Sequence, residues 1–145
     1  MFNLLASRIL APTDFSDQSC EAVELALTMV NSSNQLTVLH VAPPLNSFAM
    51  GDPGMTWEVV SDEQRAEQLR NMLRSRFSDG KFDDVQFEVV FGSPADEIAK
   101  FAEQHESELI VLPSHGRTGL ARLMIGSVAE RVVRLAHCPV LVLRN

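Results

Sequence analysis

Residues 109–127 read LIVLPSHGRTGLARLMIGS, and they combine a fully apolar run with a glycine-rich loop. The run Leu109–Leu112 carries no polar side chain, which is typical of a strand buried on both faces of a parallel sheet. The loop ends at Gly126 and Ser127, where a helical pattern begins. A buried parallel strand that leads through a loop into a helix indicates an α/β fold.

The same alternation runs along the whole chain. Short apolar runs bounded by turn residues predict five strands, and the stretches of helical period between them predict four helices. The predicted strands are 9–11, 36–41, 85–91, 109–112 and 139–143, and the predicted helices begin at or just after Ser16, Ser61, Ser93 and Ser127. The 145 residues fit a single domain, residues 1–145.

The composition excludes several classes of protein. Apolar residues make up 46% of the chain and charged residues 21%, as in a globular domain rather than a disordered one. A net charge of −7 argues against nucleic-acid binding, which needs Lys and Arg to neutralise phosphates. No apolar run reaches the roughly 18 residues of a membrane span. Residues 1–10 lack a signal-peptide pattern, so we expect a cytoplasmic protein without a membrane partner.

The loop 113–126 is the strongest candidate for a ligand site. A glycine-rich loop before a helix presents unpaired backbone N–H groups, and the helix dipole adds about half a positive charge, so phosphate is the natural ligand. Between residues 114 and 134 a single acid, Glu130, faces four arginines: Arg117, Arg122, Arg131 and Arg134. The spacing matches neither a P-loop nor the dinucleotide fingerprint. The alternative is a structural loop whose glycines only allow a tight turn.

The spacing of this loop resembles the nucleotide motif of the universal stress protein family, G-x-x-G-x(9)-G-[ST]. Gly116, the nine residues 117–125 and the pair Gly126-Ser127 match its second half. Three further runs resemble the family's first, second and last strands: Ile9–Ser16, Leu39–Val41 and Cys138–Val142. The resemblance implies an open five-stranded parallel sheet of order 3-2-1-4-5 with helices on both faces. Its ligand would lie at the switch between strands one and four.

By this resemblance the ligand is an adenine nucleotide, ATP or AMP, and any Mg²⁺ arrives with its phosphates. Asp14 would meet the ribose, and the backbone near Val41 would recognise adenine. The phosphates would be held by Gly116, Gly126 and Ser127, and the predicted site includes the neighbours Pro12, Thr13, Pro113, Ser114, His115, Arg117 and Val128. A carboxylate can accept hydrogen bonds from both ribose hydroxyls, which independently supports Asp14. Its alternative role is to cap a helix or brace a loop.

One residue departs from the motif, because Pro113 stands where the family has its first glycine. Proline has no N–H and a fixed φ, so one donor to the ligand is expected to be missing. A lost hydrogen bond to a charged group costs about 1.5–3 kcal/mol, which weakens binding without necessarily abolishing it. Pro113→Gly is therefore expected to tighten nucleotide binding.

Three functions stay open. The leading hypothesis is a nucleotide-responsive regulatory module of the stress-response type, whose ligand biases the loop 42–60 or a dimer surface that an unidentified protein partner reads. The alternatives are a weak, slow ATPase and a nucleotide-free dimerisation protein. Ser114, His115 and Asp14 could suggest a hydrolase triad, but Ser114 lacks the G-x-S-x-G elbow.

Two further expectations concern the last strand and the cysteines. Strand 139–143 would be an apolar edge without a protecting charge, so we expect a homodimer through strand five. Cys20 and Cys138 form no CxxC pair, so neither a disulfide framework nor a zinc site is expected.

Overall fold

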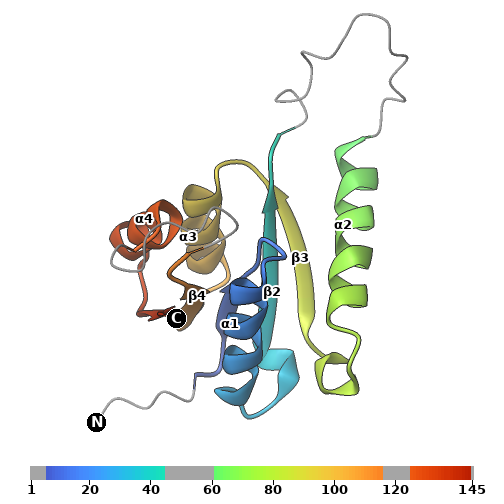
Figure 1. The fold of residues 1–145 in the computed structure, drawn as a ribbon, viewed down its shortest axis with the longest axis horizontal. Helices are drawn as coiled ribbons and strands as arrows, with labels where there is room; N and C mark the ends of the chain where they lie inside the picture. Colours follow the sequence, from blue (N-terminus) through green and yellow to red (C-terminus); the bar gives the residue numbers. More distant parts are fainter. Residues whose placement is uncertain (1–5, 45–60, 116–124, 145) are drawn as a thin grey trace, which may run out of the picture.

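The computed structural model describes residues 6–44, 61–115 and 125–144 (Figure 1). Its centre is a five-stranded parallel sheet of order β3-β2-β1-β4-β5. The strands are β1 (Ile9–Pro12), β2 (Leu36–Ala42), β3 (Gln86–Phe91), β4 (Leu109–Pro113) and β5 (Val140–Leu143). The α/β class predicted from the sequence and the strand order implied by the family resemblance are confirmed. Most of the predicted loop 42–60 lies outside the described residues.

Helices cover both faces of the sheet. They are α1 (Asp17–Thr28), α2 (Asp62–Arg76), α3 (Pro94–Gln104) and α4 (Ser127–Leu135), with short 3₁₀ turns at η1 (Ser33–Gln35) and η3 (Gly80–Phe82). One hydrophobic core joins α1 and α2 to the sheet, and a second joins α3 and α4 to the opposite face. Figure 1 accordingly shows α3 and α4 away from α1 and α2.

Side chains of the inner strands alternate between these two cores. On β4, Leu109 and Val111 pack into the core under α1 and α2, whereas Ile110 and Leu112 pack into the other. All four are at most 4% exposed. A strand that is buried on both faces favours apolar side chains at every position, which explains the continuous apolar run in the sequence.

Two of the four long helices start with a side-chain cap. The Ser16 hydroxyl accepts the Ser19 N–H at the start of α1, and Ser61 forms a capping box with Gln64 at the start of α2. Ser93 occupies the predicted N-cap position of α3 but makes no side-chain cap bond, and Gly126 has no side chain to cap α4. The two helices without a side-chain cap, α3 and α4, are those that pack on the same face of the sheet.

The strands separate at one point of the sheet. β1 pairs with β2 over four residues, Ile9–Pro12, but with β4 over only two, Ile9 and Leu10. Because β1 and β4 are followed by helices on opposite faces, their carboxyl ends form the topological switch point of the sheet.

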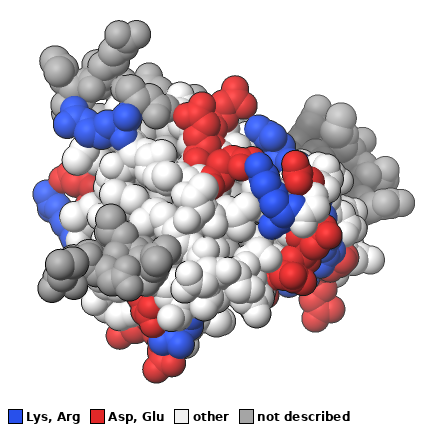
Figure 2. All heavy atoms as spheres, turned by 90° about the horizontal axis from the view of Figure 1, so that it is seen from below, with Lys and Arg blue, Asp and Glu red and all other residues white. Residues whose placement is uncertain are grey.

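The surface in Figure 2 mixes both signs of charge. Lys and Arg lie close to Asp and Glu, mostly around the margin of this face, and uncharged residues occupy much of its centre. Within the described residues, no helix is long and apolar enough to cross a membrane.

Candidate functional site

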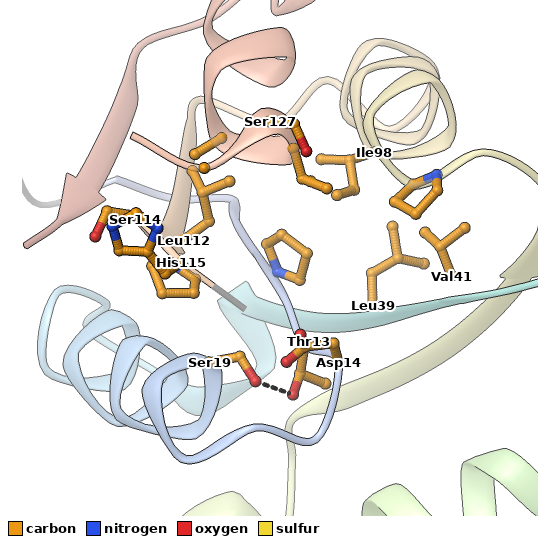
Figure 3. Close-up of a pocket in the computed structure, with 16 residues that line it drawn as sticks. Thr13, Asp14, Ser19, Leu39, Val41, Ile98, Leu112, Ser114, His115 and Ser127 are labelled. Carbon is orange, nitrogen blue, oxygen red and sulfur yellow. Dashed lines mark hydrogen bonds between the residues drawn. The ribbon is translucent and has the colours of Figure 1, made fainter. Parts of the chain in front are cut away.

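A cavity of about 240 Å³ opens at the carboxyl ends of β1 and β4 (Figure 3). It lies where the predicted ligand site was expected. Ten predicted residues line it: Pro12, Thr13, Asp14, Val41, Pro113, Ser114, His115, Gly126, Ser127 and Val128. The predicted site residues Gly116 and Arg117 lie outside the described residues.

Hydrogen bonds fix the loop between β1 and α1. The Thr13 hydroxyl lies 2.8 Å from the Ser19 hydroxyl and accepts the Phe15 N–H, over 3.1 Å. Ser19 Oγ donates to the Ser16 carbonyl at 2.9 Å, so Thr13 must be the donor of the hydroxyl pair. Thr13 and Ser19 are 5% and 2% exposed, and their polar groups are thus satisfied inside the protein.

His40 holds the same loop from β2. Its Nδ1 lies 2.8 Å from the Thr13 carbonyl, and a carbonyl can only accept, so Nδ1 carries the proton. The ring also meets the Phe15 ring edge-on, with centroids 4.8 Å apart. Phe15 has a φ of 67°, a left-handed conformation that is costly for a bulky residue. The loop is therefore held in one conformation by its surroundings.

Asp14 lies half-buried at the rim of the cavity. Its Oδ1 accepts the Ser16 N–H at 3.0 Å, which fixes the carboxylate against the start of α1. Asp14 therefore does brace the loop between β1 and α1. It does not exclude the ribose role, because an ionised carboxylate can accept about four hydrogen bonds.

The backbone of Val41 is directed at the cavity. Alternate residues of a strand face opposite neighbours, and Leu39 O accepts from Thr13 on the β1 side while Ala42 O accepts from Gly92 on the β3 side. Val41 therefore faces the β1 side. Because β1 ends at Pro12, the Val41 N–H and C=O point past the strand end toward the cavity.

Gly126 approaches the end of β4 very closely. Its N–H donates to the Ser114 carbonyl at 2.7 Å, and a Cβ at this position would lie 2.6 Å from that carbonyl oxygen. The Ser114 N–H in turn donates to Leu143 O on β5, at 2.7 Å. The glycine is thus required by backbone packing, and its N–H is already engaged.

The first turn of α4 supplies the donors instead. Glu130 is the first residue whose N–H reaches an intrahelical carbonyl, Gly126 O at 3.0 Å. The N–H groups of Ser127, Val128 and Ala129 precede it and have no intrahelical partner. All three residues line the cavity, so the positive end of the helix dipole faces it.

The arginines counted near this loop do not all contribute positive charge to the cavity. Arg131 forms a bidentate pair with Asp96 of α3, at 3.0 Å, and Arg134 pairs with Glu130 at 2.6 Å. Neither lines the cavity. The two others, Arg117 and Arg122, lie outside the described residues.

The residues of the suggested triad are not assembled. Figure 3 shows Ser114 and His115 on one side of the cavity and Asp14 on the other. In the described part of the chain, no hydrogen bond joins the Ser114 hydroxyl to the His115 ring. This arrangement offers no activated serine.

Six lining residues were missed by the sequence analysis: Ser19, Leu39, Pro94, Ile98, Leu112 and Ala129. Leu39 could have been found, because it lies two residues before Val41 on the same face of β2. Ile98 follows Pro94 by one helical turn, which puts both on one face of α3. Nothing in the sequence says that this face meets the cavity.

Both cysteines are free thiols. Burial raises the pKa of Cys20, partly opposed by the nearby Arg76, and burial also raises the pKa of Cys138. Among the described residues, no group of three or more His, Cys, Asp or Glu side chains is placed to hold a metal ion.

Known proteins are similar to this chain in sequence and in fold. The model of the universal stress protein family matches residues 6–144. Universal stress protein MJ0531 of Methanocaldococcus jannaschii is 37% identical, over 97% of this chain and 84% of its own. The structure of universal stress protein UspA from Lactobacillus plantarum matches with a TM-score of 0.68 and 26% identity, over 95% of this chain and 97% of its own. A universal stress protein in complex with cAMP matches with a TM-score of 0.65 and 21% identity, over 96% and 97%. The chain thus belongs to the universal stress protein family.

Proposed function

We propose that this chain binds an adenine nucleotide, ATP or AMP, in the switch-point cavity and acts as a nucleotide-responsive regulatory module. The proposal rests on one observation: two opposite sides of the cavity carry different chemical groups. A carboxylate and an outward-facing strand backbone lie on one side of the cavity, and an uncapped helix start lies on the other. These groups complement the ribose, base and phosphate of one nucleotide.

The base and sugar would lie against β1 and β2. The Val41 N–H and C=O are suited to the donor and acceptor edge of adenine, and the buried side chains of Leu39 and Ile98 provide apolar contact. Asp14 would accept hydrogen bonds from the ribose hydroxyls. A volume of about 240 Å³ lies below the roughly 300–1,000 Å³ of pockets for drug-sized ligands, which suits a nucleoside whose phosphates extend outward.

The phosphates would lie at the start of α4. The N–H groups of Ser127 and Val128 and the Ser127 hydroxyl offer donors, and the helix dipole favours an anion there. Gly126 would shape this wall rather than donate to it, because its N–H is bonded to Ser114 O. Any Mg²⁺ would be carried by the phosphates.

A protein of similar structure supports the proposal at the level of the fold. The universal stress protein in complex with cAMP has the same fold, so the fold can accommodate an adenine nucleotide. The second candidate function is a nucleotide-free interaction protein. It is favoured by the contact between Gly126 and Ser114 O, which accounts for that glycine without any ligand.

The test is a calorimetric titration with Mg-ATP and with AMP. We expect saturable binding with a dissociation constant in roughly the micromolar range, near −8 kcal/mol. Asp14→Asn should weaken it by about tenfold or more, because it removes a charged acceptor while Oδ1 can still accept the Ser16 N–H. Asp17→Asn is the matched control, since that side chain is 95% exposed outside the cavity. Equal affinity in both variants would remove the ribose role.

We also propose that the protein forms a homodimer through β5. This strand is an edge of the sheet, and its four residues are only half-buried. Pro139, just before β5, and Leu143 of β5 accept from β4, so the alternate residue Val142 directs its N–H and C=O outward. On α4, which packs beside β5, Val133 and Leu135 are 50% and 47% exposed.

The dimer can be tested by removing one outward donor. Val142→Pro should leave the bonds between β4 and β5 intact and shift the mass by light scattering toward that of the 16.0 kDa monomer. Val142→Ala keeps the N–H and should stay dimeric. A monomeric wild type at tens of micromolar protein would contradict the proposal.

A further inference from the structure

We propose that Pro12 and Pro113 act as a wedge that separates β1 from β4 and thereby forms the cavity. Both residues line it. Their effect on ligand affinity rests on the proposed function, but the separation of the strands can be measured without any ligand. The wedge gives Pro113 a role other than the lost ligand donor inferred from the motif.

The direction of each backbone group follows from its neighbours in the sheet. Ile110 and Ser114 both donate to β5, over 3.0 and 2.7 Å, so the odd-numbered residue Pro113 faces β1. Thr13 donates to β2 over 2.8 Å, so the even-numbered Pro12 faces β4. The two proline nitrogens therefore face the gap between β1 and β4 from opposite sides.

The pairing of these strands stops where the prolines begin. The last pair is Leu10 with Ile110, although β1 continues to Pro12 and β4 to Pro113. If this parallel register continued, the next rung of the ladder would consist of two hydrogen bonds. One would run from the N–H of residue 12 to the Val111 carbonyl, and the other from the N–H of residue 113 to the Pro12 carbonyl. Neither proline has an N–H, so that rung cannot form.

The rings also take up space. Each proline places its Cδ where the N–H hydrogen would be. A carbon stays about 3.3–3.6 Å from a carbonyl oxygen, whereas an N–H···O bond spans about 2.9–3.0 Å. Closing the two strands to ladder distance would therefore press both rings against carbonyls.

The separation affects only one side of each strand. Pro12 remains in register with Leu39 of β2, and Pro113 remains in register with Leu143 of β5. These sides need no N–H from either proline, because the proline nitrogens face the gap. The prolines thus open one boundary of the sheet, at the switch point, and leave the neighbouring ladders intact.

The experiment replaces the prolines by alanine, singly and together. In Pro12→Ala/Pro113→Ala we expect both new amides to form the missing rung and to exchange with deuterium at least about 100-fold more slowly than unprotected amides. The matched control is Pro139→Ala, which adds an N–H at the start of β5, away from the cavity. If the double variant does not fold, each single variant reports on one amide.

Affinity for AMP provides the second readout. We expect the double variant to bind about tenfold more weakly than the wild type and Pro139→Ala, because the rung must open before the ligand enters. Unprotected new amides would overturn the wedge, and so would tighter binding by Pro113→Ala, which would mean that the new N–H meets the ligand. Protected amides in a protein whose wild type binds no nucleotide would support the wedge and refute the proposed function.

Discussion

Helices α1 and α4 both begin at the cavity, but their first turns are built in opposite ways. At α1 the Ser16 hydroxyl caps the Ser19 N–H, and the buried hydroxyls of Thr13 and Ser19 bond to each other. At α4 no side chain caps the helix, and Ser127 and Val128 keep their N–H groups toward the cavity. One wall is a rigid, satisfied support for Asp14, and the other is a surface with donors to offer.

The largest effect is expected where the α4 wall meets β4. Gly126→Ala would place a Cβ 2.6 Å from the Ser114 carbonyl oxygen, and neither backbone segment can yield easily. We expect a loss of about 2–3 kcal/mol in the free energy of unfolding, measured in urea without ligand. Gly80→Ala is the control, because its Cβ would find only Asp83 at 3.8 Å. An equal effect at both glycines would mean that Gly126 is not packed as described.

The close contact between Gly126 and the Ser114 carbonyl also changes how a charged substitution at residue 126 is interpreted. From the motif alone, Gly126→Asp would be expected to abolish nucleotide binding by repelling phosphate. The contact with Ser114 O means that any side chain at residue 126 disturbs the fold first. Lost binding in that variant would not locate the phosphates.

The donors of α4 can be removed without this disturbance. Ser127 is the first residue of the helix, where proline is well tolerated, and the extended conformation of Gly126 suits a residue before proline. Ser127→Pro should weaken AMP binding by about 10- to 30-fold, near 1.5–2 kcal/mol, and leave adenosine binding unchanged. Ser127→Ala keeps the N–H but removes the hydroxyl, so it measures what the hydroxyl contributes to AMP binding. An equal loss for adenosine would place the phosphate elsewhere.

A substitution in the α1 wall, whose polar groups are hydrogen-bonded within the protein, should lower the stability of the fold. Thr13→Val keeps the shape of the side chain but deprives the buried Ser19 hydroxyl and the Phe15 N–H of their partner. We expect a loss of about 1 kcal/mol in the free energy of unfolding. Thr28→Val removes an exposed hydroxyl at the other end of α1 and should cost less than about 0.5 kcal/mol. If both variants lose the same amount, the hydroxyl pair does not stabilise the loop.

The sequence predicted the strands and helices well because their signals were local. Apolar runs, the Ser16 and Ser61 caps and the proline after Ser93 each depend on neighbours in the chain. The strand and helix starts they indicated agree closely with β1, β2, β4, α1 and α2.

The chemistry of the site was harder to predict because it depends on contacts between distant residues. Arg131 looked like positive charge for a phosphate, but its partner Asp96 lies 35 positions earlier, on α3. Gly126 looked like a phosphate ligand, but its N–H is bonded to Ser114, across the loop. The motif pointed to the end of the sheet where the cavity lies, but it did not show which backbone groups are available there.

The proposed function requires that an adenine nucleotide occupies the cavity between these two walls. The most direct measurement is a titration of the ¹⁵N-labelled protein with AMP and with Mg-ATP, followed by amide chemical shifts. We expect saturable shifts at Asp14, Val41, Ser127 and Val128, and none on the outer face of α2. Shifts that do not saturate at millimolar nucleotide, or that gather away from the cavity, would contradict the claim.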